Sequence, residues 1–184
     1  MSVTVVPAFT ARQVARVGVS DTVRSVRVVH SLDGIDRDVS GEDVLAAGQA
    51  LWQRWLRHPA YRDHDVILGL DAGGILPTVA VSMASATPYR LAWKLHLDLP
   101  GKVRFEEPHA RRVDVFAYGD FTGRRVLIVD DEVTTGRTAV NLVAALRGVA
   151  ADVIGMLCLV EDGAAGCRGV LEQHAVPLCS LTTL

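Results

Sequence analysis

The stretch Val126-Leu-Ile-Val-Asp130-Asp131-Glu-Val-Thr134-Thr135-Gly136-Arg-Thr138 decides what fold is expected of this chain. It opens with four apolar residues, which is typical of a short strand buried on both faces. Two adjacent carboxylates follow, and the Thr-Thr-Gly-Arg-Thr segment after them stands where a helix begins. A buried strand, a polar loop and a helix in succession form the repeating unit of an α/β sheet.

The same succession recurs on both sides of this stretch. We expect strands at residues 65–70, 89–93, 125–129, 153–160 and 176–181, and helices at residues 40–58, 75–85, 138–147 and 170–174. Such a series predicts an α/β fold with a doubly wound, mostly parallel sheet. Ligands of these sheets bind beyond the C-terminal ends of the strands, and the loops at 71–74 and 130–138 both fall there.

The N-terminal part has a different pattern. Short extended pieces are expected at Val3–Val6 and Thr22–His30, and residues 95–113 show no clear period and are expected to form a long loop. Ser40 is a plausible N-cap of the first helix, with Asp43 three residues later. We therefore divide the chain into residues 1–60, with strands and a helix, and an α/β core at 61–184. The histidines at positions 30, 58 and 64 are expected at the surface.

Composition narrows the class of protein. The chain has 184 residues, 49% of them hydrophobic and 22% charged, which suits one folded domain rather than disorder. A formal net charge of −2 argues against a broad nucleic-acid-binding face. The three cysteines, Cys158, Cys167 and Cys179, form no CxxC pair, so neither a disulfide framework nor a zinc site is indicated. The sequence shows neither the basic and apolar regions of a signal peptide nor an apolar run of roughly 20 residues, so we expect a cytoplasmic protein.

The chemistry of the central stretch points to a sugar phosphate. Carboxylates at the edge of a sheet accept hydrogen bonds from sugar hydroxyls or hold a hard cation. The free N–H groups and positive dipole end of a helix N-terminus favour phosphate, and threonine hydroxyls add donors. An ordinary turn at Asp130-Asp131 with capping threonines would explain each half separately, but not their combination. The P-loop and GxGxxG patterns are absent.

The whole segment resembles the PRPP signature of the type I phosphoribosyltransferases. The resemblance implies that Asp130 and Asp131 contact the ribose hydroxyls and a Mg²⁺ ion, and that the following loop wraps the 5-phosphate. This loop comprises Thr134, Thr135, Gly136, Arg137 and Thr138. It also implies a type I phosphoribosyltransferase-like sheet, a small N-terminal hood over the site, and a homodimer.

Other segments follow in the order that the resemblance requires. Asp71, Ala72, Gly73 and Gly74 stand where relatives have the pyrophosphate loop, which often carries an uncommon cis peptide bond. Independently, a glycine-rich turn after a buried strand exposes backbone N–H groups. Lys94 stands where relatives have a lysine that touches pyrophosphate, although a plain surface lysine is a close alternative. Residues 95–112 occupy the place of a mobile catalytic loop, whose basic groups are His96, Lys102, Arg104, His109, Arg111 and Arg112.

The acceptor base stays open. The stretch Leu159–Gly166 and the C-terminal residues resemble the tail of orotate phosphoribosyltransferases, but those enzymes carry Asp-Arg where this chain has Glu161-Asp162. An acidic residue there would repel orotate. Adenine phosphoribosyltransferases share the order of the segments, but their Glu-Ala-Arg-Gly loop is replaced by residues 71–74. The resemblance covers roughly residues 65–184.

Three hypotheses result. The first is an enzyme that transfers the 5-phosphoribosyl group of Mg-PRPP to a nitrogenous base in nucleotide metabolism, with Asp131, Lys102 and Arg104 as catalytic residues. The second is a non-catalytic PRPP-sensing regulator or binding protein. The third is a specialised-pathway enzyme with an unusual acceptor. The partners expected are PRPP and a small base, with neither nucleic acid nor membrane.

Overall fold

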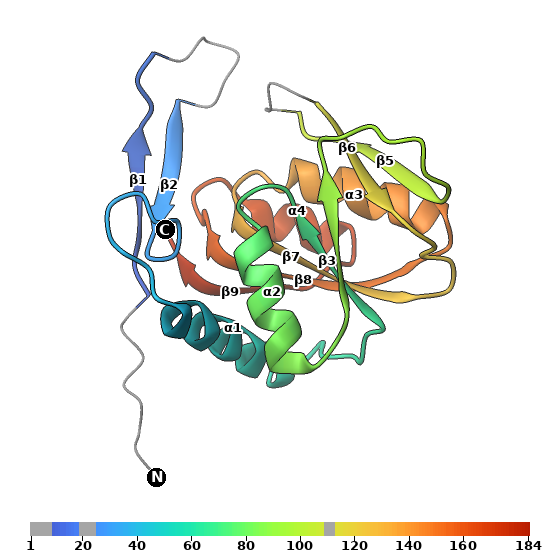
Figure 1. Cartoon of the computed structure of the whole chain (residues 1–184), viewed down its shortest axis with the longest axis horizontal. Coiled ribbons are helices and arrows are strands. Elements are labelled where there is room, and N and C mark those ends of the chain that lie inside the picture. The colour runs from blue at the N-terminus through green and yellow to red at the C-terminus, as the bar shows by residue number, and fades with distance from the viewer. Residues whose placement is uncertain (1–8, 19–24, 109–112) are drawn as a thin grey trace.

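A computed structural model of the chain describes residues 9–18, 25–108 and 113–184 (Figure 1). Seven strands form the main sheet, in the order β5-β6-β4-β3-β7-β8-β9. Their bounds are β3 Val66–Leu70, β4 Tyr89–Trp93, β5 Lys102–Glu106, β6 Asp114–Tyr118, β7 Arg125–Val133, β8 Asp152–Glu161 and β9 Leu178–Thr183. The strands from β4 through β3, β7 and β8 to β9 are parallel. This confirms the predicted doubly wound, mostly parallel sheet.

Helices cover both faces of the sheet. Helices α1 (Gly41–Leu56) and α2 (Ile75–Ser85) lie on one face, and α3 (Arg137–Gly148) and α4 (Cys167–Gln173) lie on the other. Alternate residues of β7 serve the two layers: Leu127 joins the core under α1 and α2, and Ile128 joins the core under α3 and α4. Because both faces are covered, every residue of β3 is buried, which explains its unbroken apolar sequence.

Helix α1 begins where the sequence predicted. Ser40 accepts a hydrogen bond from the backbone N–H of Asp43, and the Asp43 carboxylate accepts one from the backbone N–H of Ser40. This reciprocal capping box satisfies two donors that a helix start leaves free. Trp55 and Leu51 then anchor the helix in the core, each fully buried. Among the helices of the described ranges, none is long and apolar enough to cross a membrane.

The prediction of a long loop at residues 95–113 was wrong. Residues 102–106 and 114–118 form an antiparallel hairpin, β5–β6, whose strand β6 also pairs antiparallel with β4. Val103 and Phe105 point into the core under α3, while the intervening charged residues are exposed. The alternation in Lys102-Val103-Arg104-Phe105-Glu106 is the period-two signal of a half-buried strand, and the prediction overlooked it.

The N-terminal part forms a separate two-stranded antiparallel sheet. Its strands are β1 (Ala11–Ala15) and β2 (Val26–His30), with Ala11 opposite His30. Val28 and Leu32 are buried in the core under α1 and α2, which attaches this hairpin to the main sheet. The extended piece expected at Val3–Val6, and the start of the piece expected at Thr22–His30, lie outside the described residues.

Candidate functional site

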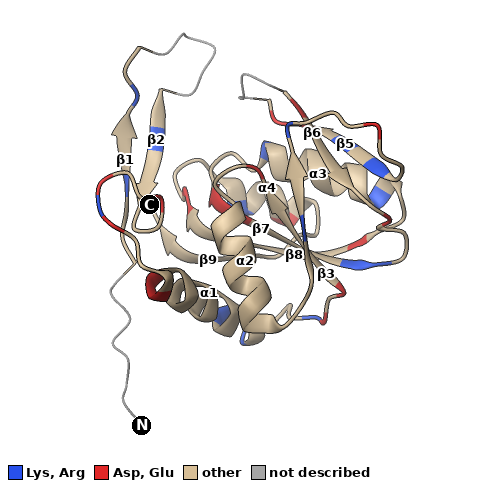
Figure 2. Cartoon of the chain, in the orientation of Figure 1, with Lys and Arg blue, Asp and Glu red and all other residues tan. Residues whose placement is uncertain are grey.

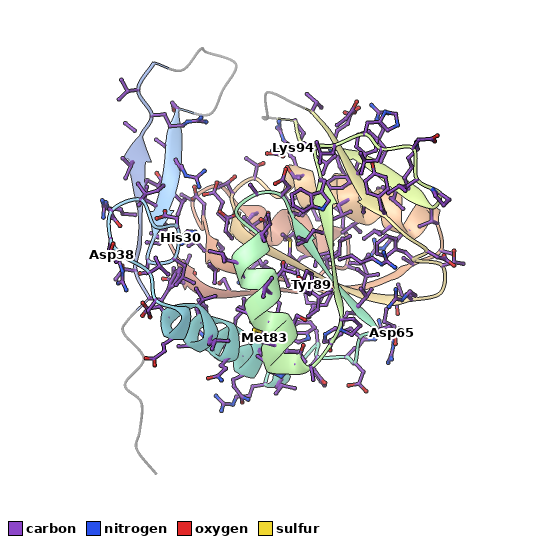
Figure 3. The ribbon with its side chains drawn as sticks, viewed as in Figure 1. His30, Asp38, Asp65, Met83, Tyr89 and Lys94 are labelled. Carbon is purple, nitrogen blue, oxygen red and sulfur yellow. The ribbon has the colours of Figure 1, made fainter. Side chains whose placement is uncertain are left out.

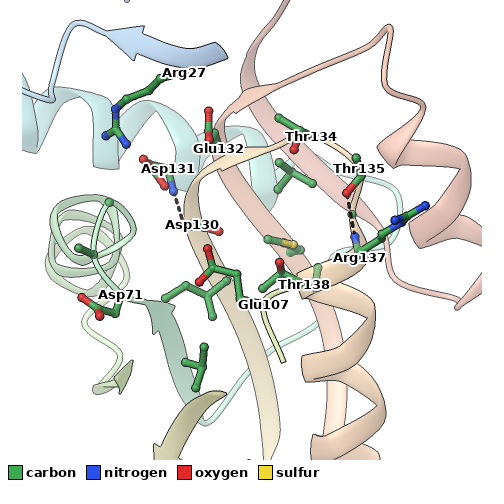
Figure 4. A pocket seen from close by; sticks show the side chains of 18 of the residues that line it. Arg27, Asp71, Glu107, Asp130, Asp131, Glu132, Thr134, Thr135, Arg137 and Thr138 are labelled. Carbon is green, nitrogen blue, oxygen red and sulfur yellow. Dashed lines mark hydrogen bonds between the residues drawn. The ribbon is translucent and has the colours of Figure 1, made fainter. Parts of the chain in front are cut away.

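A cavity of about 350 Å³ lies at the C-terminal ends of the central strands (Figure 4). Strand β3 leads into Asp71, strand β4 leads into Lys94, and strand β7 carries the acid pair. Because parallel strands end at one edge, residues far apart in sequence meet here. The wall includes the predicted Asp71, Ala72, Gly73, Lys94, Asp130, Asp131, Thr134, Thr135, Gly136, Arg137 and Thr138, together with Arg16, Val26, Arg27, Phe105, Glu107 and Glu132.

Asp130 and Asp131 lie within β7, not after it. The sequence predicted that the chain leaves the strand at residue 130, but β7 continues to Val133 because β8 keeps pairing with it up to Glu161. Pairing with β3 stops at Gly69 and Val129, so this side of β7 opens toward the loop at 71–74. Both carboxylates nevertheless line the cavity, as predicted.

The two carboxyl groups have different acidities. Burial raises the pKa of Asp130 well above its ordinary value, and the adjacent charge of Asp131 raises it further. Burial also raises the pKa of Asp131, but the nearby His30 imidazole and the Asp130 carboxyl lower it more, so this pKa lies below its ordinary value. Asp131 is therefore the member of the pair that carries the negative charge most readily.

His30 is one of several residues at this site that were not predicted from the sequence, together with Arg16, Arg27 and Glu107 of the cavity wall. It is only 6% exposed, which corrects the expectation of a surface histidine. Its Nε2 lies 3.8 Å from Oδ2 of Asp131, and its Nδ1 accepts a hydrogen bond from the backbone N–H of Leu32. With Nδ1 as acceptor, a neutral ring carries its proton on Nε2, facing Asp131. Figure 3 shows His30 at the base of the N-terminal hairpin.

The loop at 71–74 lies directly against the acid pair. A Cβ atom on Gly73 would stand 2.0 Å from an Asp131 carboxylate oxygen, and one on Gly74 would stand 2.9 Å from an Asp130 oxygen. Only glycine therefore lets this loop pass so close to the carboxylates. The peptide bond between Asp71 and Ala72 is cis, as the family resemblance implied.

The threonine loop leads into the N-terminus of α3. Gly136 has φ of 73°, a left-handed conformation that favours glycine, and α3 begins at the next residue. Within the described part of the chain, no side chain caps this helix start. The N–H of Arg137 makes only a long contact, 3.5 Å, with Oγ1 of Thr135. Backbone donors and threonine hydroxyls thus face the cavity together (Figure 4).

Lys94 lies at the cavity in an ion pair. Its Nζ is 2.8 Å from Oε2 of Glu107, a residue just beyond β5 that also lines the cavity. Both side chains are about one-quarter to one-third exposed. The predicted pyrophosphate-binding lysine is therefore in place, with a carboxylate beside it.

Lys102 and Arg104 are not brought to the cavity. They stand on the outward face of β5, where Lys102 contacts His96 at 3.0 Å and Arg104 binds Asp114 at 2.8 Å. Neither residue is part of the cavity wall. The other basic residues predicted for this loop, His109, Arg111 and Arg112, lie outside the described residues.

A doubly wound sheet with an acid pair and a phosphate-type loop at its C-terminal edge is an arrangement that suits a phosphorylated sugar. The comparison with sequence families specifies the class further. Residues 41–172, which begin at the first residue of α1, match the phosphoribosyl transferase domain. The chain belongs to this family.

Known proteins agree with this assignment. A hypoxanthine/guanine phosphoribosyltransferase from Methanococcus maripaludis is 32% identical over 102 residues, 55% of each chain. An adenine phosphoribosyltransferase from Leishmania donovani superposes with a TM-score of 0.70 at 22% identity, over 94% of this chain and 76% of that one. An orotate phosphoribosyltransferase from Mycobacterium tuberculosis, solved with inorganic phosphate, gives 0.56 at 23% identity, over 79% and 73%. The chain spans about half the length of the curated relatives it matches.

Proposed function

We propose that the chain is a phosphoribosyltransferase that transfers the 5-phosphoribosyl group of Mg-PRPP to a nitrogenous base. The observation that supports this most is the joint placement of three predicted segments in one cavity. Asp130 and Asp131, the threonine loop and residues 71–73 line it, whereas Gly74 does not. The three relatives named above are phosphoribosyltransferases with different bases in their names, which supports the transfer and leaves the base undefined.

Each chemical group of PRPP can be matched to a set of residues that line the cavity. The N-terminus of α3 and the hydroxyls of Thr134, Thr135 and Thr138 suit the 5-phosphate. The loop at 71–74 and Lys94 suit the pyrophosphate. Asp130 and Asp131 lie between these two ends and suit the ribose hydroxyls (Figure 4). A carboxylate pair beside the ribose would also stabilise the positive charge that develops on the sugar in the transition state.

A magnesium ion fits this arrangement as a companion of PRPP. Among residues 9–18, 25–108 and 113–184, no cluster of three or more acidic, histidine or cysteine side chains could hold a metal by itself. Mg²⁺ usually keeps several waters and binds through one or two carboxylates plus substrate phosphates. Asp130 and Asp131 would supply those carboxylates, and the ion would neutralise the pyrophosphate as it leaves.

The transfer itself is a substitution at the anomeric carbon. A ring nitrogen of the acceptor forms the new bond to this carbon, while the bond to the pyrophosphate oxygen breaks and pyrophosphate leaves with the electron pair. Asp131, which ionises more readily than Asp130, stabilises the positive charge that the sugar develops. Lys94 stabilises the leaving group. The catalytic roles predicted for Lys102 and Arg104 would require the β5–β6 hairpin to move, because both residues stand on the outward face of β5, away from the cavity.

The alternative of a non-catalytic PRPP sensor has one observation in its favour, since Lys102 and Arg104 point away from the cavity. One assay separates the two functions. The protein is incubated with PRPP, Mg²⁺ and a panel of bases, and released pyrophosphate is measured. Pyrophosphate release that depends on one class of base supports the transferase. Tight PRPP binding without release for any base would replace it with the sensor.

The site assignment has its own test. Asp130→Asn with Asp131→Asn should weaken the affinity for Mg-PRPP at least tenfold, because two acceptors for the ribose hydroxyls are lost. Calorimetric titration measures this directly. Unchanged affinity would show that the acid pair does not hold the ribose.

We further propose a homodimer that works in the cytoplasm. Helix α2 exposes Leu76 at 45% and Met83 at 63%, two large apolar side chains two turns apart. Figure 3 labels Met83 on this helix. Such a face suits a subunit contact. The three cysteines are all buried and free, which suits a reducing compartment. Light scattering coupled to size exclusion measures the mass in solution, and a mass of one chain would contradict the dimer.

A further inference from the structure

Two arginines of the N-terminal hairpin line the cavity. Arg27 lies in β2, and Arg16 lies just beyond β1, where its backbone N–H donates to the carbonyl of Ser25 at 2.8 Å. Their side chains are exposed, and within the described ranges neither has an ion-pair partner. Two other arginines, Arg12 and Arg37, do form ion pairs, with Asp36 and Asp43. The guanidinium groups of Arg16 and Arg27 are thus available to a ligand in the cavity.

These arginines stand at the wall that the PRPP assignment leaves unused. Under the proposed function, the 5-phosphate lies at the threonine loop, and the pyrophosphate lies at Asp71 and Lys94. Figure 4 shows Arg27 and Asp71 on opposite sides of Asp131. The hairpin side is therefore the side on which an acceptor approaches the sugar.

The hairpin wall offers donors and positive charge. Its side chains at the cavity are Arg16, Val26 and Arg27, and behind them His30 directs its Nε2 toward Asp131 without a hydrogen-bond partner within the described ranges. A neutral base placed here would accept only ordinary hydrogen bonds from the two guanidinium groups, and it would not compensate their positive charge. An anion would form charge-assisted hydrogen bonds, which are about twice as strong as neutral ones, and arginine suits a planar carboxylate in particular.

We infer that the acceptor is an anionic nitrogen heterocycle, one whose ring carries a carboxylate that Arg16 and Arg27 bind. The inference rests on the proposed function and defines its substrate class. One objection came from the acidic step Glu161-Asp162, which was expected to repel such a substrate. In the structure, the buried Glu161 carboxylate accepts hydrogen bonds from Arg168 and Thr183. The Asp162 carboxylate accepts hydrogen bonds from the Gln13 side chain and from the backbone N–H of Ala165. Both residues lie outside the cavity wall, so neither carboxylate faces the proposed anion.

The test uses pairs of heterocycles that differ only at the carboxyl position: nicotinate with nicotinamide, and orotate with uracil. Binding of each compound to the full-length protein is measured by calorimetry in the presence of Mg²⁺ and PRPP, and pyrophosphate release is measured in parallel. We expect at least one carboxylated member to bind at least tenfold more tightly than its neutral partner. Tighter binding of the neutral members, or no difference within either pair, overturns the inference.

Variants locate the effect. Arg16→Gln with Arg27→Gln should remove the preference for the carboxylated member while the affinity for Mg-PRPP stays within about twofold. Replacement of both by lysine should restore part of it, because the charge returns. Arg12→Gln is the matched control: Arg12 lies on β1 of the same hairpin, pairs with Asp36 and does not line the cavity. If the glutamine double variant loses as much affinity for Mg-PRPP as for the carboxylated heterocycle, the arginines bind PRPP and the inference is overturned.

The two proposals fail in different ways. Selective binding of the carboxylated member without pyrophosphate release retains the anion site and removes the transferase. Pyrophosphate release with the neutral members alone retains the transferase and removes the anion site.

Discussion

At the scale of single residues, the backbone at Gly73 packs directly against the Asp131 carboxylate. The backbone of the 71–74 loop passes so near the carboxylate that there is no room for a Cβ atom at position 73. The loop that is proposed to hold pyrophosphate and the carboxylate that is proposed to hold ribose therefore fix each other's position. A substitution at Gly73 should act on ligand binding through Asp131.

Gly73→Ala should weaken the affinity for Mg-PRPP at least about tenfold, roughly 1.4 kcal/mol. The added methyl group would lie 2.0 Å from a carboxylate oxygen, so the Asp131 side chain must leave its position. Crowding should also lower the free energy of unfolding by about 1–3 kcal/mol. Calorimetry measures the first effect and urea unfolding the second. Gly169→Ala is the control, because open space surrounds that glycine; an effect of equal size there would refute the argument.

A second prediction concerns Asp65, which joins the start of β3 to the start of β7. Arg125 donates to both Asp65 carboxylate oxygens, at 3.2 and 2.7 Å from its side chain and 2.8 Å from its backbone N–H. These bonds hold the pKa of Asp65 far below its ordinary value of 3.8. A depressed pKa contributes stability that is present above the unfolded-state pKa and is lost as the pH falls toward the folded-state value.

The wild-type protein should therefore lose stability on acidification from about pH 4 downward more steeply than Asp65→Asn does. Urea unfolding at a series of pH values between 5 and 2 gives the slope. Arg125→Gln should flatten the curve in the same interval, because it removes the partner that depresses the pKa. Identical slopes for wild type and Asp65→Asn would show that this pair does not govern acid stability.

At the scale of elements, the parts with regular local patterns could be predicted from the sequence. The α1 capping box, the buried strands and the loops at 71–74 and 134–138 depend on neighbouring residues, and they lie where expected. The hairpin β5–β6 was missed because its glycine, proline and charged residues obscured a short alternating pattern. The contact of His30 with Asp131 joins residues about a hundred positions apart, and no local pattern encodes it.

The β5–β6 hairpin also brings Glu107 against Lys94. If Lys94 binds pyrophosphate, this carboxylate competes with the ligand for the same ammonium group. Glu107→Gln should then tighten the binding of Mg-PRPP by roughly two- to fivefold, the range expected for a partly exposed pair. Lys94→Gln should weaken it. The neighbouring Glu106→Gln is the control, since Glu106 pairs with Arg104 on the other face of the strand. Weaker binding in Glu107→Gln would mean that Glu107 assists the ligand.

At the scale of the whole molecule, charge is separated across the cavity. Acidic side chains lie on the sheet at the end of β7. Figure 2 shows basic residues, in blue, on the N-terminal hairpin β1–β2. The net charge of −2 conceals this arrangement, so composition alone could not reveal it.

Ligand binding at one edge should stabilise the entire fold, because the cavity joins β3, β4, β7, α3 and the N-terminal hairpin. Mg-PRPP at a hundred times its Kd should add about 2.7 kcal/mol to the free energy of unfolding and raise the Tm by roughly 5–10 °C. Differential scanning fluorimetry with and without the ligand measures this shift. Asp130→Asn with Asp131→Asn, at the same ligand concentration, should lose about half of it or more, because an affinity at least tenfold weaker leaves at most about 1.4 kcal/mol. Asp152→Asn, whose carboxylate pairs with Arg62 away from the cavity, should retain it. A full shift in the double variant would mean that PRPP stabilises the fold from another site, since the walls at 71–74 and 134–138 converge on these two carboxylates.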